Sequence, residues 1–133
     1  MQIAAETQEE IEQVRKNCGY FFMDGWSILS AKGKDTLPFL QTQTTNDALQ
    51  LQMGQGQSSA ITDRQARLIT SFSLHRMDKN ESWLLSDNSK TLHDHLESYH
   101  FREVVAFEIP NLDLLALQGP KSILVLEKIF SSL

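Results

Sequence analysis

The chain has 133 residues, of which 41% are hydrophobic and 22% are charged. This length corresponds to about one domain, which can build a core without disulfides. Its 17 acidic residues outnumber the 12 lysines and arginines, which gives a net charge of -5. Because a sequence-independent nucleic-acid binder needs clustered positive charge, this balance argues against that class of protein.

Three features of the sequence bear on its compartment. Cys18 is the single cysteine, so the chain cannot form an internal disulfide, which fits a reducing compartment. No run reaches the roughly 18 apolar residues that a membrane span requires. The N-terminus carries Glu6, Glu9 and Glu10 and is too acidic for a signal or transit peptide. We therefore expect a cytoplasmic protein, or one of the mitochondrial matrix in a eukaryote, with no membrane partner.

The first part of the chain predicts a helix, a strand and a second helix. The helix spans residues 6–17, where Thr7 and Glu10 have the spacing of a capping box. A strand follows at residues 26–30. Asp35 is placed to cap the next helix, whose apolar side chains are Leu37, Phe39 and Leu40.

The middle of the chain predicts three strands followed by a helix. The strands cover residues 58–62, 68–74 and 83–85, and Asn88 or Ser89 is placed to cap a helix that runs to about residue 99. Within the second strand one period-2 face is apolar or small, and the other face is more polar. The apolar face carries Leu68, Thr70, Phe72 and Leu74, and the other carries Ile69, Ser71 and Ser73.

The last part predicts two strands, at residues 104–109 and 112–117, and a final helix that opens at Gly119-Pro120. Runs of strands between helices indicate an α+β fold with a largely antiparallel sheet and packed helices. We expect a single domain over residues 1–133. Its parts are an N-terminal helix at 1–18, a core at 19–118 and a terminal helix at 119–133.

Residue chemistry alone yields no catalytic constellation. The four histidines, His75, His93, His95 and His100, lack the spacing of a metal motif, so no metal site is expected. A second observation concerns basic residues at predicted turns. They either keep the turns soluble or form a local patch for a small anionic ligand such as a polyglutamate chain. These residues are Lys32, Lys34, Arg64 and Arg67.

Four ordered segments resemble the family that joins YgfZ-type folate-binding proteins to the T protein of the glycine cleavage system. They are residues 26–35, 39–47, 63–74 and 117–121. The LQxQxTxD form of the second segment is more similar to the YgfZ branch. The resemblance implies a folate-binding domain made of two similar αβ halves, of which this chain would supply the first. Such a half would expose apolar surface and could associate into a homodimer.

The same resemblance argues against aminomethyl transfer. The T protein carries an acidic pair after the hairpin turn, and the matching positions here are Thr70 and Ser71. A hydroxyl cannot supply negative charge near a developing cation at neutral pH. The glycine usual in that turn is replaced by Ala66. We therefore expect no catalytic residues, although the enzyme question stays open.

The resemblance implies four folate-binding residues. Trp26 would stack on the flat pterin, and Ser71 and Ser73 would line the same pocket. Asp87 would accept a hydrogen bond from a pterin amino group. Each has a plainer alternative: Trp26 as ordinary core, the two serines as a solvated strand face, and Asp87 as a helix cap.

The resemblance leads to one main hypothesis and two alternatives. The main one is a non-catalytic protein that binds tetrahydrofolate and assists iron–sulfur cluster assembly or repair, with iron–sulfur proteins as partners. One alternative is an aminomethyltransferase of the T-protein kind. The other is a truncated fold that has lost its pocket and acts as an interaction module through the apolar segment 112–130.

Overall fold

The computed structural model describes residues 5–131, which form two compact units. The smaller unit combines the two ends of the chain, Met1–Asp24 and Asp113–Leu133, and the larger unit is Gly25–Leu112. The expectation that both units belong to one domain stays a prediction.

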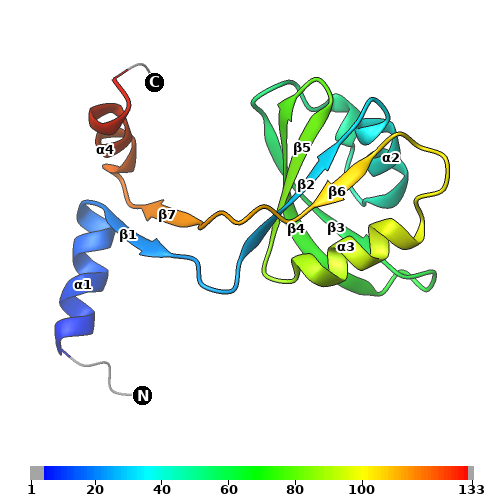
Figure 1. Ribbon diagram of the computed structural model, residues 1–133. Helices are drawn as coiled ribbons and strands as arrows, with labels where there is room; N and C mark the ends of the chain where they lie inside the picture. The colour runs from blue at the N-terminus through cyan, green and yellow to red at the C-terminus, as the bar shows by residue number, and fades with distance from the viewer. Residues whose placement is uncertain (1–4, 132–133) are drawn as a thin grey trace. The chain divides into compact units, whose positions relative to one another are not determined.

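The larger unit is built on a five-stranded sheet in which every neighbouring pair is antiparallel (Figure 1). The strand order is β3-β4-β5-β2-β6. Its elements, in chain order, are β2 (Ser27–Lys32), α2 (Thr36–Gln43), the short 3-10 helix η1 (Ala48–Gln50), β3 (Gly56–Thr62), β4 (Leu68–Asp78), β5 (Glu81–Ser86), α3 (Ser89–Ser98) and β6 (Ala106–Glu108). The predicted α+β class with an antiparallel sheet is confirmed.

Helices α2 and α3 cover one face of this sheet and enclose the core. The core side chains form one cluster, to which each helix and the central strands contribute: Leu29, Ala31, Phe39, Leu40, Leu74, Leu84, Leu92 and Leu96. Thr70, Phe72 and Leu74 of β4 are buried while Ser71 is exposed, as the predicted alternation requires. Leu68 departs from the pattern and is exposed because it is the first residue of the strand, next to the hairpin turn.

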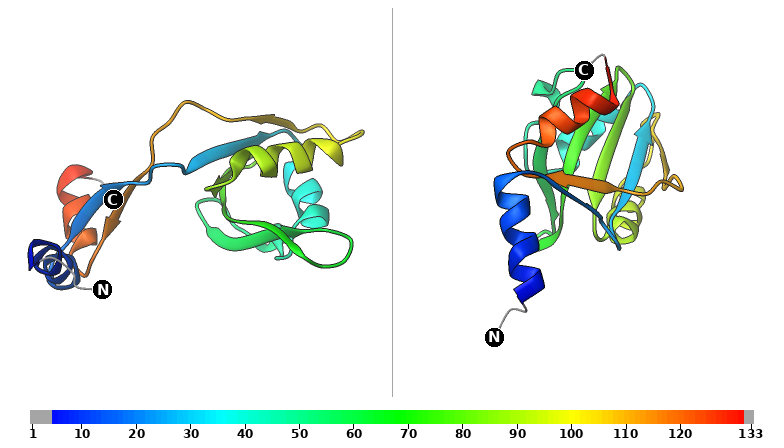
Figure 2. Two further views of the ribbon diagram at one scale, coloured as in Figure 1. Left: turned by 90° about the horizontal axis from the view of Figure 1, so that it is seen from below. Right: turned by 90° about the vertical axis from the view of Figure 1, so that its left-hand side faces the viewer.

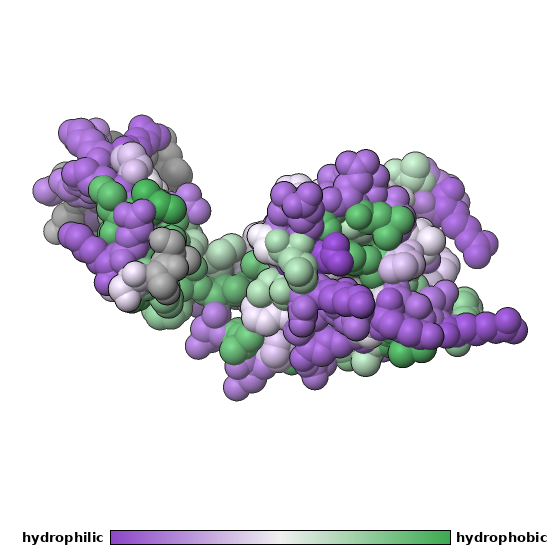
Figure 3. All heavy atoms as spheres, turned by 90° about the horizontal axis from the view of Figure 1, so that it is seen from above, coloured by the Kyte–Doolittle hydropathy of each residue, from purple (hydrophilic) through white to green (hydrophobic). Residues whose placement is uncertain are grey.

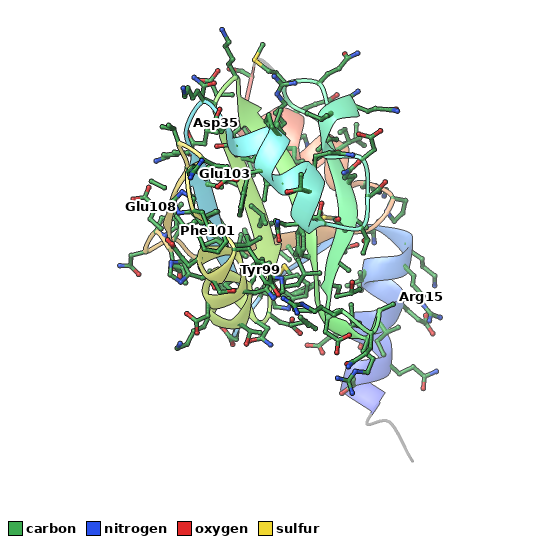
Figure 4. The ribbon with its side chains drawn as sticks, turned by 90° about the vertical axis from the view of Figure 1, so that its right-hand side faces the viewer. Arg15, Asp35, Tyr99, Phe101, Glu103 and Glu108 are labelled. Carbon is green, nitrogen blue, oxygen red and sulfur yellow. The ribbon has the colours of Figure 1, made fainter. Side chains whose placement is uncertain are left out.

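The turn between β2 and α2 is held by contacts with the loop that precedes β6. Gly33 has φ of +149°, and a Cβ there would lie 1.9 Å from the carbonyl oxygen of Val104. Asp35 occupies the N-cap position of α2 but makes no side-chain capping bond. Its Oδ2 accepts the Val104 N–H at 2.8 Å, in the segment that also carries Glu103 (Figure 4). The predicted cap at Asp35 is therefore wrong, because its carboxylate holds the loop before β6 instead.

Of the other two predicted caps, the one at Thr7 is wrong, whereas the one at Asn88 or Ser89 is correct in position. Thr7 lies inside its helix, which already includes Ala5, so Thr7 and Glu10 do not form a capping box at the helix start. Asn88 holds the N-cap position of α3 without a side-chain bond. Ser89 instead donates its hydroxyl to the carbonyl oxygens of Ser27 and Ser86 at 3.1 and 3.2 Å, which ties the helix to the ends of β2 and β5.

The smaller unit contains α1 (Ala5–Lys16), β1 (Gly19–Phe22), β7 (Leu115–Gln118) and α4 (Ser122–Ile129). The two strands form an antiparallel ribbon (Figure 2), with Tyr20 opposite Leu117 and Phe22 opposite Leu115. None of its residues whose burial is described is buried. Figure 3 shows apolar side chains in green at the surface among polar ones.

Two elements escaped the sequence analysis, β1 and η1. Gly19 follows the predicted first helix and begins β1, in a stretch where no element was predicted. The remaining helices and strands occur where they were predicted, with shifted ends: β4 runs on to Asp78, and β6 and β7 are shorter than expected. Among residues 5–131, no helix has the length and apolar character needed to cross a membrane.

Candidate functional site

A hollow of about 370 Å³ lies on the larger unit and brings three of the four predicted folate-binding residues together. Trp26, Ser71 and Ser73 line it. Ser58, Ser59 and Phe72 complete the lining. The hollow therefore brings the exposed indole of Trp26 beside the hydroxyls of Ser58, Ser71 and Ser73.

The sheet register explains how the serines meet. Ser73 lies directly opposite Ser58 across the β3–β4 ladder, and Ser71 lies two residues before Ser73. Residues two apart on a strand point to the same side, so Ser71 and Ser73 share the sheet face that α2 and α3 do not cover. The structure thus places the predicted serines on one face, as the alternation of β4 indicated.

Trp26 precedes β2 and is 38% exposed, so it is not an ordinary core residue. Its neighbour Ser27 pairs with Ser86 at the end of β5. Asp87 follows Ser86 directly, is exposed and is not among the residues that line the hollow. It is not the N-cap residue of α3, a position that Asn88 holds.

The hydroxyls of the hollow differ in their hydrogen bonding. Ser73 Oγ lies 3.0 Å from Nε2 of His75, a residue that the sequence analysis did not assign to the site. Ser59 Oγ is buried and has no hydrogen-bond partner in the described part of the chain. Ser59 lies opposite Phe72 of the core, so its hydroxyl faces the core side of the sheet and not the face of Ser71 and Ser73.

The two residues that match the acidic pair face different sides of the sheet. Thr70 is buried, and its Oγ1 lies 3.5 Å from Ser86 Oγ. Ser86 Oγ in turn donates to the carbonyl oxygen of Ser71 at 3.1 Å. Only the side chain of Ser71 is therefore presented at the hollow, and neither position carries a charge.

The basic turn residues do not act as one free cationic patch. Lys32 Nζ contacts Glu108 at 2.8 Å and Glu81 at 3.6 Å, and the hydrogen bond that Lys32 donates to Glu108 raises the pKa of Lys32. Arg67 Nε contacts Asp63 Oδ2 at 2.7 Å. These two cations are neutralised locally, which favours the interpretation that they stabilise turns.

Two further hollows contain none of the predicted site residues. One, of about 280 Å³, lies between the end of α2, the β3–β4 turn and α3, and it includes Arg64, His95 and Tyr99. Burial lowers the pKa of His95, whose ring packs against Tyr99 with centroids 4.9 Å apart. The other, of about 770 Å³, lies between α1 and β1.

Over residues 5–131, no group of three His, Cys, Asp or Glu side chains is placed to hold a metal ion.

Comparisons with known proteins agree on the relationship of the chain. Over 127 residues it is 29% identical to an aminomethyltransferase of Prosthecochloris aestuarii. That alignment covers 89% of this chain and 34% of the related protein. Over 123 residues it is 30% identical to an aminomethyltransferase of Thermus thermophilus, covering 90% of this chain and 35% of that protein. The chain thus spans about a third of the length of these relatives.

A solved structure shows the same fold. The crystal structure of glycine cleavage system aminomethyltransferase T from Bartonella henselae superposes with a TM-score of 0.84 at 24% sequence identity. The superposition covers 90% of this chain and 34% of that chain. The family model described as the GCVT N-terminal domain matches residues 1–133. The chain therefore belongs to the family of the GCVT N-terminal domain.

Proposed function

We propose that this chain binds tetrahydrofolate, with the pterin ring in the hollow beside Trp26. The observation that carries the proposal is the gathering of Trp26, Ser71 and Ser73 around one hollow. An indole ring can stack on a flat heteroaromatic ring, and hydroxyls can donate to or accept from its polar edge. The volume of about 370 Å³ lies within the range of small-molecule sites.

The residues present fit a ligand of this kind. The hydroxyl of Ser73 lies on the open face of the sheet at the hollow, where it can bond a pterin nitrogen or oxygen. The side chains of Ser58 and Ser71 offer further hydroxyls there. In this proposal Asp87, just beyond the end of β5, accepts a hydrogen bond from the pterin amino group.

We further propose that binding is not coupled to aminomethyl transfer. Transfer would gain from a negative charge near the cation that develops on the folate. The hollow presents the neutral hydroxyl of Ser71 at that place, and Thr70 is turned into the core. A hydroxyl stays uncharged at neutral pH.

Aminomethyl transfer is the second candidate, and the names of the related aminomethyltransferases favour it. The two candidates differ in turnover. A protein that binds tetrahydrofolate but releases no aminomethyl group from a loaded carrier supports binding alone. Turnover that Ser71→Ala abolishes would support the transferase instead.

A role in iron–sulfur cluster assembly or repair is the finer part of the proposal. Support comes from the LQxQxTxD segment at residues 39–47, which resembles the YgfZ branch. A single cysteine cannot ligate a cluster that usually needs four, so the partner would hold it. We expect loss of the gene to lower the activity of iron–sulfur enzymes in the cell. The wild-type gene should restore that activity and a Trp26→Ala gene should not.

The test of binding is a calorimetric titration of the 133-residue chain with tetrahydrofolate under anaerobic, reducing conditions. We expect saturable binding that Trp26→Ala weakens about tenfold or more, since an aromatic anchor carries much of the affinity of such sites. Trp83→Phe is the matched control, because Trp83 does not line the hollow. Absence of saturable binding, or equal affinity of the Trp26→Ala variant, would contradict the proposal.

A further inference from the structure

His75 stands just outside the hollow and touches one of its hydroxyls. It follows Ser73 by two residues on β4 and therefore shares its sheet face. Its Nε2 lies 3.0 Å from Ser73 Oγ, while His75 itself does not line the hollow. Any effect of His75 on a ligand there would pass through Ser73.

The neighbouring strand leaves room for the imidazole at Gly56. Gly56 lies directly opposite His75 in the β3–β4 ladder. A Cβ on Gly56 would lie 2.5 Å from His75 Nδ1 and 2.7 Å from its Cε1. Real Cβ atoms do not approach a ring so closely, so the ring rests on the bare backbone of Gly56, and a larger residue would displace it.

The surroundings of the ring indicate which nitrogen carries the proton. Nδ1 faces Gly56, which has no side chain to accept a hydrogen bond. On the other side Trp83 pairs with His75, and its indole N–H is already donated to Glu81 at 2.8 Å. Glu81 in turn contacts Lys32. Within residues 5–131 the ring's one hydrogen bond is with Ser73 Oγ. A proton on Nε2 can therefore be donated to Ser73, whereas a proton on Nδ1 would have no acceptor among these residues.

We propose that His75 is a positioning residue that makes the Ser73 hydroxyl a hydrogen-bond donor to the ligand. With Nε2–H donating to Oγ, the hydroxyl proton is free to point into the hollow at an acceptor such as the pterin carbonyl oxygen. With the opposite arrangement the hydroxyl proton is held by His75, and only lone pairs face the ligand. This inference rests on the proposed tetrahydrofolate site and assigns specificity within it.

The binding test uses tetrahydrofolate titrations of single and double variants of the whole chain. We expect His75→Leu to weaken binding by about three- to tenfold, the usual size of one hydrogen bond. Gly56→Ala should give a similar loss by displacing the ring. His75→Gln, which keeps a donor, should restore much of the affinity. Met77→Ala, at an exposed residue further along β4 that does not line the hollow, should leave the affinity unchanged.

A double-mutant cycle separates positioning from general damage. In a Ser73→Ala background, His75→Leu should cause no further loss beyond about twofold. A loss of the same size in both backgrounds would overturn the inference, as would unchanged affinity of His75→Leu. Thermal unfolding of each variant identifies any that fail to fold, and His75→Gln then carries the comparison.

A second measurement does not depend on the ligand. Nitrogen NMR of the imidazole in the free chain should show the proton on Nε2, with a resonance that Ser73→Ala shifts. A proton on Nδ1 would overturn the inference even if tetrahydrofolate binds. Failure of the wild-type chain to bind tetrahydrofolate would overturn the proposed function, and the ligand role of His75 with it.

Discussion

Ala66 is the residue at which local backbone strain is most evident. It has φ of 60°, in the left-handed region that a side chain other than glycine occupies at a cost. It lies in the β3–β4 turn, where its N–H donates to the carbonyl oxygen of Asp63 at 3.0 Å. The resemblance had identified this position as one usually held by glycine, and the backbone supplies the physical reason.

We therefore expect Ala66→Gly to stabilise the larger unit by about 0.5–1 kcal/mol, because relief of the left-handed strain exceeds the added chain entropy of glycine. Urea unfolding followed by circular dichroism would measure the change. Ala60→Gly in β3 is the matched control and should destabilise the unit. Equal effects of the two substitutions would show that the turn is not strained.

Asp63 organises the same turn and should make folding stability depend on pH. Hydrogen bonds from the backbone and side chain of Arg67, and from the backbone of Gln65, hold the pKa of Asp63 below its ordinary value of 3.8. Its contribution to stability is therefore complete above that value and is lost as the pH falls through the lowered pKa. We expect Asp63→Asn to reduce the acid sensitivity of unfolding between about pH 4 and pH 2. Identical pH profiles for both proteins would contradict this assignment.

At the scale of elements, α3 is held mainly by two leucines. Leu92 and Leu96 are both 0% exposed and belong to the core cluster under the sheet. We expect Leu92→Ala to lower the free energy of unfolding by about 2–5 kcal/mol, because it removes buried methyl groups and leaves a cavity. Leu49→Ala, at a 55% exposed leucine, should change it by less than about 0.5 kcal/mol. Chemical unfolding of both variants tests the difference. Similar losses of unfolding free energy would mean that Leu92 of α3 contributes no more than an exposed leucine.

The elements also show which sequence signals were informative. The alternation in β4 predicted which side chains enter the core and which reach the hollow, since a strand presents successive residues to opposite faces. Capping residues were less informative. Asp35 and Asn88 hold the N-cap positions without a side-chain capping bond, and Asp35 and Ser89 bond to distant segments instead. A local motif cannot report such competition.

At the scale of the molecule, the smaller unit exposes several large apolar side chains. Tyr20, Phe22 and Leu115 lie on one face of the β1–β7 ribbon and are 71%, 63% and 55% exposed. A two-stranded ribbon is marginal in isolation, and contiguous exposed apolar residues usually mark an association surface. The homodimer stays a prediction, and this face of the β1–β7 ribbon is the surface through which we expect it to form.

We expect sedimentation equilibrium to show concentration-dependent dimers, because a second copy can cover this apolar face. Tyr20→Lys combined with Phe22→Lys should shift the chain to monomer. Met53→Lys, at a 64% exposed residue of the larger unit, is the control and should not. A wild-type chain that stays monomeric at every concentration would refute the prediction. Dimers without affinity for tetrahydrofolate would favour the interaction-module alternative.

The sequence by itself determined the α+β class, the family and most elements, because periodicity, turn residues and short ordered segments are local signals. Tertiary structure decided the rest. The pairing of β1 with β7 joins residues about a hundred positions apart. The local sequence around Tyr20 and Phe22 does not predict a strand partner at that distance. The hollow likewise needs Trp26, which precedes β2, beside Ser73 of β4, and the ring of His75 lies over Gly56 of β3. Such contacts depend on register across the folded sheet, which only the packing of the whole chain fixes.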